Sequence, residues 1–221
     1  MAIEFSGADW WLATGASTDH DFTTTTGTDM LVVCLAINAS AASNSVTFNS
    51  DALTKQLTAD NISDCRAVIW YKLNPDIGTY TLNSSMSSYQ ATVIGAYNVK
   101  GINTSTPFGN SNTTVADSGN SASLDVSTLA GQVVIDCLVN QQTDAADPVE
   151  GANQTELFVG SWGTYYMYGC SSYELAVGST TNMSWSWDTT ATRYAYAAIA
   201  IIPDSYPSVG GRILTPNARI W

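Results

Sequence analysis

An internal repetition constrains this chain more than any other feature of its sequence. The apolar run from Leu31 to Asn38 returns as Val133 to Asn140, and Tyr71-Lys72-Leu73 returns as Tyr173-Glu174-Leu175. Both returns lie 102 residues after the originals. A shared offset predicts two similar sets of strands that together complete one sandwich, rather than two unrelated domains.

The rest of the pattern is also that of strands. Runs rich in Val, Ile, Thr and Tyr recur roughly every eight to twelve residues between clusters of Ser, Asn, Asp and Gly, and no long stretch has helical periodicity. We therefore expect an all-β fold, a single jelly-roll or β-sandwich domain built from the two strand sets. Strands are expected near residues 30–38, 44–49, 52–58, 64–73, 78–84, 90–99, 121–127, 132–140, 153–159, 164–175, 181–187 and 193–202.

Two of these strands carry information about burial. In the strand at 64–73 one face is apolar, and we expect it to face the core; its residues are Cys65, Ala67, Ile69, Tyr71 and Leu73. The opposite face carries Arg66, Val68, Trp70 and Lys72. By contrast, the run from Tyr194 to Ile202 is apolar on both faces, as in a central strand covered on both sides, and Pro203 ends it.

These patterns divide the chain into three parts. Residues 1–27 are expected to be an N-terminal arm and first edge segment, residues 28–203 the sandwich, and residues 204–221 an extended C-terminal arm. The arm combines apolar and basic side chains on an acidic protein, which predicts that it docks onto another surface. The expected docking residues are Tyr206, Arg212, Ile213, Leu214, Arg219, Ile220 and Trp221. The alternative is that the arm packs back on its own sandwich as an edge strand.

The charge balance narrows the choice of partner. The chain has 19 acidic and 7 basic residues, a net charge of −12, and only 12% charged residues. Such a protein is repelled by phosphate backbones and by anionic lipid surfaces, so we expect neither nucleic acid nor membrane as a partner. The first residues do not resemble a secretion signal, and no apolar run is long enough to span a bilayer, which predicts a protein made and kept in a cytoplasm.

Residues that could carry catalysis are few. His20 is the single histidine, and in an extended segment its neighbours Asp19 and Asp21 point away from it, which breaks a triad arrangement. The carboxylates that could serve a glycosidase are Glu150, Glu156, Glu174 and Asp188, but nothing in the sequence places two of them across a cleft. We expect no catalytic residues, no enzyme activity and no cofactor.

Metal binding and disulfide formation also find little support. The acidic stretch 144–150 offers oxygen ligands without the spacing of a calcium loop, so a solvated loop is the simpler interpretation. The four cysteines, Cys34, Cys65, Cys137 and Cys170, contain no CxxC pair. We expect them to be reduced, and Cys34 and Cys137 to be buried in apolar strands.

The tryptophans suggest an alternative function, which is carbohydrate binding. Exposed indole rings stack on sugar rings, so Trp10, Trp11, Trp162, Trp185 and Trp187 are candidate glycan-stacking residues. Trp185 and Trp187 share one strand face and are therefore both inside or both outside. Core filling is the competing interpretation for this group.

Several segments resemble a known group of domains. The residues that carry the resemblance are Val46–Thr54, Ala67–Leu82, Gly131–Asp136 and Met183–Trp185. They are similar to jelly-roll (concanavalin-like) domains of tailed-phage virion proteins and of bacterial surface proteins, over residues 28–202. The resemblance implies a jelly-roll sandwich without catalytic residues. Asp136, inside an otherwise apolar strand, departs from the pattern and puts the burial of that strand in question.

The expected function follows from the resemblance. We expect a non-enzymatic structural protein of a tailed-phage virion, such as a capsid decoration or cement protein, which assembles in the host cytoplasm and lies on the virion surface. Its partners would be the major capsid protein or another virion protein and further copies of itself, most simply in a trimer. A carbohydrate-binding module of a fibre or surface protein is the main alternative, and a small glycosidase is the third.

Overall fold

The computed structural model describes residues 2–13, 15–38, 43–61, 65–88, 91–142, 146–163, 167–191 and 193–205. These residues form the strands β1 to β17, and the described part of the chain contains no helix. The strands pair in antiparallel fashion throughout. The expected all-β sandwich is therefore confirmed.

The first half of the chain forms two sheets. The larger one has the order β1 (Glu4–Ala13), β9 (Thr92–Lys100), β3 (Met30–Asn38), β7 (Cys65–Leu73) and β6 (Thr54–Asn61). The smaller one has the order β2 (Ser17–Thr24), β8 (Gly78–Met86), β4 (Ser43–Phe48) and β5 (Asp51–Ala52). Consecutive strands mostly alternate between the two sheets, which is the connectivity of a jelly roll.

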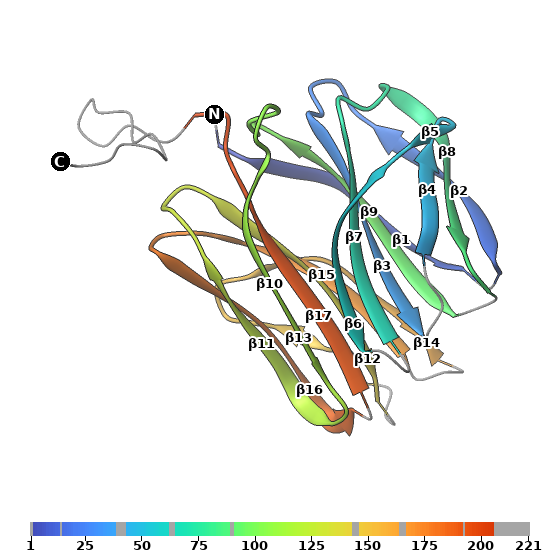
Figure 1. The fold of residues 1–221 in the computed structure, drawn as a ribbon, viewed down its shortest axis with the longest axis vertical. Helices are drawn as coiled ribbons and strands as arrows, with labels where there is room; N and C mark the ends of the chain where they lie inside the picture. Colours follow the sequence, from blue (N-terminus) through green and yellow to red (C-terminus); the bar gives the residue numbers. More distant parts are fainter. Residues whose placement is uncertain are drawn as a thin grey trace.

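The second half repeats this arrangement. Its larger sheet has the order β10 (Phe108–Ala116), β17 (Arg193–Ile201), β12 (Val133–Gln141), β15 (Met167–Leu175) and β14 (Thr155–Trp162). Its smaller sheet has the order β11 (Gly119–Ser127), β16 (Thr180–Ala191) and β13 (Val149–Glu150). Each strand has its counterpart in the first half at the same place in the sheet, so the sequence repetition corresponds to a repeated fold. In Figure 1 the first half runs from blue to green and the second from yellow-green to red.

The two halves stack as four layers. The two larger sheets face each other in the middle, and the smaller sheets cover their outer faces. Three apolar cores result: one within the first half, one between the halves and one within the second half. A larger-sheet strand is thus covered on both sides, which explains why the run of β3 is buried from Met30 to Ile37.

The structure corrects two expectations about which faces are buried. Cys65, Ala67 and Ile69 of β7 do face the central core, but the opposite face of β7 is also covered. Val68 and Trp70 pack inside the first half, at 1% and 5% exposure. Asp136, whose burial was in question, is fully buried.

The register of the repetition is also corrected. Met30 lies opposite Leu73 and Val99, whereas Val133 lies opposite Leu175 and Ile201. Met30 therefore corresponds to Val133, an offset of 103, although Leu73 and Leu175 differ by 102. The sequence alignment with a single offset of 102 thus slips by one residue in β12, and such a slip exchanges the two faces of a strand.

Aromatic contacts between the halves are reciprocal. Phe5 of the first half stacks on Tyr173 of the second, with ring centroids 4.3 Å apart. Phe108 of the second half meets Tyr71 of the first at 4.8 Å. Phe5 corresponds to Phe108, and Tyr71 to Tyr173, by their places in the ladders. Asn38 and Gln141, which also correspond, pair with each other by a side-chain hydrogen bond. The halves are therefore related by an approximate twofold axis.

The expected N-terminal arm is part of the sheets. Residues 1–27 supply β1 and β2, each at the edge of its sheet. These two strands and β10 were absent from the expected strands, because their outward residues are exposed and polar and they lack long apolar runs. β10 is the extreme case, with no fully buried residue.

Candidate functional site

The segment expected to dock begins at a fixed point of the sandwich. β17 ends at Ile201, and Pro203 then forms a bridge with Ile102. The backbone N–H of Asp204 donates to the carbonyl oxygen of Gly101 at 2.8 Å. The predicted docking residues themselves, Tyr206, Arg212, Ile213, Leu214, Arg219, Ile220 and Trp221, lie outside the described residues.

An apolar hollow opens beside this point. Its volume is about 700 Å³, and its walls include Ile3, Tyr173, Leu175, Val177, Pro203 and Ser205. Leu175 and Val177 are large apolar residues that remain 56% and 87% exposed. Exposed apolar side chains that border a hollow are typical of a surface for protein contacts. The sequence did not indicate this hollow, because its walls come from four distant segments that only the fold brings together.

The candidate glycan-stacking residues do not form one platform. Trp185 and Trp187 are buried, as are the side chains on their face of β16, and Trp11 is 9% exposed. Two of the buried indole N–H groups have hydrogen-bond partners, which allows these rings to be buried. Trp187 donates to the Gly119 carbonyl at 2.9 Å, and Trp185 donates to Asp136 at 2.9 Å. Trp162 is half-buried. Trp10, at 40% exposure, is the member of the group that offers a substantial surface.

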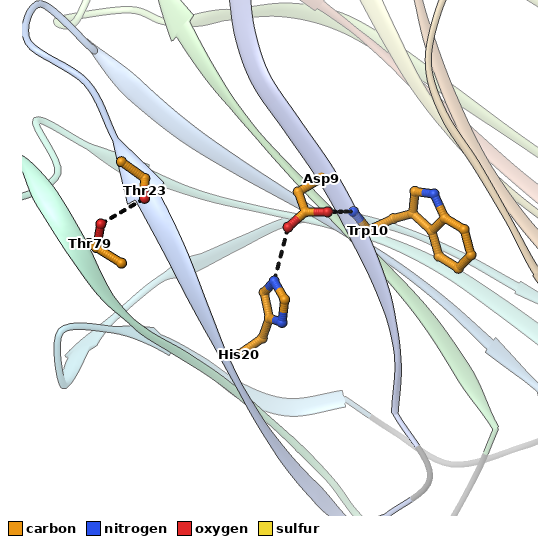
Figure 2. Close-up of polar contacts among 5 residues, drawn as sticks. All are labelled: Asp9, Trp10, His20, Thr23 and Thr79. Carbon is orange, nitrogen blue, oxygen red and sulfur yellow. Dashed lines mark hydrogen bonds and ion pairs between the residues drawn. The ribbon is translucent and has the colours of Figure 1, made fainter.

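His20 pairs with a residue that the sequence did not indicate. Its Nε2 lies 3.0 Å from Oδ2 of Asp9, which is on the neighbouring strand β1 (Figure 2). The other carboxylate oxygen of Asp9 accepts the backbone N–H of Trp10 at 2.8 Å. The imidazole ring stacks on Trp11 with centroids 4.0 Å apart. These contacts are a hydrogen bond and a ring stack between β1 and β2, and among the described contacts of the ring there is no hydroxyl or thiol for it to activate.

Asp136 forms a buried polar network inside the second half. Its Oδ2 accepts hydrogen bonds from the Tyr196 hydroxyl at 2.7 Å, the Ser172 hydroxyl at 2.8 Å and the Trp185 indole. Its Oδ1 accepts the Ser172 backbone N–H at 2.5 Å. Burial raises the pKa of Asp136 to about 6, although these hydrogen bonds oppose the rise.

The corrected register shows which residues of the first half occupy the positions that correspond to this network. Asp136 corresponds to Val33, Ser172 to Trp70 and Tyr196 to Ile94 in the first half. One half thus fills this place with apolar side chains and the other with hydrogen-bonded ones. The side-chain amide of Gln154 also donates to Oδ2, at 3.4 Å. Because all five hydrogen-bond contacts of the carboxylate are with donors, the buried charge is compensated. The network is therefore the main chemical difference between the two cores.

A second hollow lies on the small sheet of the second half. It measures about 320 Å³, and its walls include Ser121, Ser123, Glu150, Asn182, Ser184 and Trp185. The lining thus combines hydroxyl and amide groups and one carboxylate with apolar residues, among them Ala122 and Val149. Of the candidate glycosidase carboxylates, Glu150 lines this hollow, whereas Glu156, Glu174 and Asp188 are not among its lining residues.

Two of those carboxyl groups have altered acidity. Burial, and then repulsion by Glu150 and Asp147, raise the pKa of Glu156 above its ordinary value. Burial alone raises the pKa of Glu174. Glu156 is on β14 and Glu174 on β15. Partial burial accounts for the direction at Glu174, and partial burial together with nearby carboxylates accounts for the direction at Glu156, without a catalytic role.

The structure also locates the candidate metal ligands and the cysteine thiols. Within the described ranges, no three His, Cys, Asp or Glu side chains are grouped so that they could hold a metal ion. Asp147 and Glu150 of the acidic stretch are described, and Asp144 is not. All four cysteines are free and buried. Burial raises the pKa of Cys65 to about 12 and those of Cys137 and Cys170 well above the usual range, so these thiols are poor nucleophiles.

Comparisons with known proteins add no assignment. No protein-family model, no curated protein and no solved structure matches this chain. In the part of the chain that the structure describes, no helix is long and apolar enough to cross a membrane. The molecule is thus defined by its fold, two related all-β sandwiches in one chain, and by its two hollows and the buried carboxylate.

Proposed function

We propose that this chain is a non-enzymatic structural protein of a tailed-phage virion, a decoration or cement protein that lies on the capsid surface. The observation that supports this most directly is the apolar hollow at the root of the 206–221 segment. It gives one end of the molecule a surface suited to protein contacts. The partner would be the major capsid protein or another virion protein, with the decoration protein itself most simply a trimer.

The composition of the segment supports the same role. Ile213, Leu214, Ile220 and Trp221 are large apolar residues, and burying one such side chain stabilises a contact by roughly 1.5–3 kcal/mol. Four of them together would contribute roughly 6–12 kcal/mol, which is of the same order as the cost of association, about 4–15 kcal/mol. The two arginines Arg212 and Arg219 would orient the segment on an acidic surface.

Removing the segment tests the proposal. A chain that ends at Ser205 keeps every described strand, so its circular dichroism should match that of the full chain. Its binding to particles, measured by co-sedimentation, should fall at least tenfold. The matched control replaces residues 206–221 with a Gly/Ser segment of equal length, which should bind as poorly as the truncated chain. Undiminished binding of either variant would refute a docking role for the segment.

Carbohydrate binding remains the second candidate, because two observations favour it. Trp10 presents an indole ring at 40% exposure, and the second hollow is lined by hydroxyl and amide groups. Sugars are recognised by such aromatic faces and polar groups together. A glycan array with the full chain and with Trp10→Ala separates this function from virion attachment, since attachment through the 206–221 segment does not depend on Trp10.

A further inference from the structure

We propose that the apolar hollow of one copy receives the 206–221 segment of a second copy of this chain, an inference that rests on the proposed structural function. The hollow and the segment are complementary in kind. Ile3, Tyr173, Leu175 and Val177 supply an apolar lining, and the segment carries apolar pairs at 213–214 and 220–221. Leu175 and Val177, the most exposed of the lining residues named, lose the most contact with water when the hollow is filled.

The position of the segment's root favours a second copy over the same chain. Pro203 and Ser205 are themselves part of the wall, and Pro203 is fixed by its bridge to Ile102. A residue before proline favours extended backbone, and Tyr206 precedes Pro207. The first glycines that allow a sharp reversal are Gly210 and Gly211.

The lengths involved lead to the same conclusion. A hollow of 700 Å³ is roughly 11 Å across, whereas the five residue steps from Ser205 to Gly210 would span about 17 Å if extended. An extended path would therefore carry Ile213 and Leu214 past the chain's own hollow. A segment from a neighbouring copy can enter without reversing its direction.

Charge supports the same partner. Three acidic residues are chain neighbours of the lining: Glu4 follows Ile3, Glu174 lies between Tyr173 and Leu175, and Asp204 lies between Pro203 and Ser205. The segment carries Arg212 and Arg219 beside its apolar pairs. The net charge of −12 favours the approach of this basic segment, and opposite charges around an interface affect its specificity more than its affinity.

This contact is heterologous, because a segment on one copy meets a hollow on the next. Contacts of this kind close into rings when the rotation between copies allows it. A trimer is the smallest such ring beyond a pair, and it agrees with the oligomer expected for the proposed function. Each subunit would then both donate and receive a segment.

Two variants test the inference; each keeps only one of the two interacting parts, the hollow or the segment, and is called half-competent for that reason. The chain that ends at Ser205 retains a hollow and lacks a segment, and Val177→Asp retains a segment but places a charge in the hollow. Val177 is 87% exposed, so the substitution should not affect folding. Val149→Asp, at another exposed valine, is the matched control. The full chain and the control should oligomerise, and each half-competent variant alone should be monomeric in analytical ultracentrifugation.

Mixing the two variants gives the decisive result. One segment and one intact hollow remain, so the equimolar mixture should form a dimer of one copy of each, and no larger species. A mixture that stays monomeric overturns the inference. So does a full chain that is monomeric and that binds added 206–221 peptide only after its own residues 206–221 are removed, because its own segment would then fill its own hollow. If the mixture dimerises while the full chain fails to bind particles, the contact stands and the virion function falls.

Discussion

At the scale of single residues, the two halves differ most at Asp136. A carboxylate at this depth is tolerated because five donors surround it, from Gln154, Ser172, Trp185 and Tyr196. The corresponding place in the first half holds Val33 and Trp70, and the buried indole N–H of Trp70 has no hydrogen-bond partner among the described residues. The same strand position is thus stabilised by apolar packing in one half and by hydrogen bonds in the other.

This difference makes stability depend on pH. The pKa of Asp136 is about 6 when folded, against an ordinary value of 3.8, so the folded state binds the proton more tightly than the unfolded state. Stability from this group is fully present below pH 3.8 and is lost as the pH rises through 6. The loss amounts to about 3 kcal/mol.

Asp136→Asn should remove that part of the pH dependence. Urea denaturation between pH 4 and pH 8 measures the free energy of unfolding of both proteins. The variant is expected to be less stable at pH 4, because the hydroxyl oxygen of the protonated carboxyl group can still accept a hydrogen bond whereas the NH2 group of Asn only donates and would face other donors, but its stability should decline less between pH 4 and pH 7. Parallel pH profiles for the two proteins would show that Asp136 titrates alike in the folded and unfolded states.

At the scale of elements, the close approach of the larger sheets depends on small residues. A Cβ atom on Gly169 of β15 would lie 2.6 Å from the Cβ atoms of Ala36 and Val93, which belong to the opposite sheet. Neither neighbour has a flexible end that could move aside. The sheets can therefore pack at this distance only where one side chain is missing.

Gly169→Ala should accordingly destabilise the protein by about 1–3 kcal/mol through overpacking. Gly178→Ala is the matched control, because a Cβ atom at Gly178 would meet no atom within 4 Å. Thermal denaturation should show a lower Tm for the first variant and a nearly unchanged Tm for the second. Equal Tm values for both variants would mean that the sheets can separate at no cost.

The strands also show how much of the fold could be predicted from the sequence. The apolar strands of the larger sheets were predicted because burial on both faces leaves long apolar runs, as from Met30 to Ile37. β1, β2 and β10 were not, because an edge strand with exposed faces carries no such run. The register of β12 was wrong by one residue, because Asn140 resembles Asn38 although Gln141 takes its place in the fold.

The candidate site divides in the same way, into features that strand alternation predicts and features that depend on tertiary structure. The arrangement of His20 between Asp19 and Asp21 could be deduced from strand alternation, but its partner Asp9 comes from another strand and depends on tertiary structure. The burial of Trp185 could not be decided, since its face of β16 was known to be uniform but not known to be inward. The apolar hollow joins segments far apart in the chain, and no local pattern indicates such a place.

At the scale of the whole molecule, the central core is shared by both halves. Buried side chains from β3, β7 and β9 meet those from β12 and β17 between the larger sheets. Either half alone would expose this apolar face to water. The two sandwiches are therefore expected to depend on each other for solubility, although each has a core of its own.

Dividing the chain tests this dependence. A cut after Ser105, in the bend between Ile102 and Phe108, leaves every strand intact. Residues 1–105 and 106–221 expressed separately should aggregate, whereas the two fragments expressed together should co-purify in a 1:1 ratio with the circular dichroism of the intact chain. A soluble, folded single fragment would show that the interface between the halves is dispensable.

The reciprocal contacts of Phe5 with Tyr173 and of Phe108 with Tyr71 have a consequence for how this molecule can change over generations. In a symmetric dimer of identical subunits, every mutation is inherited at two places at once, so a change that helps one copy must be tolerated by the other. Joining both halves in one chain removes that condition. One copy could acquire Asp136 while the other kept Val33, and the shared interface still holds the two divergent copies together.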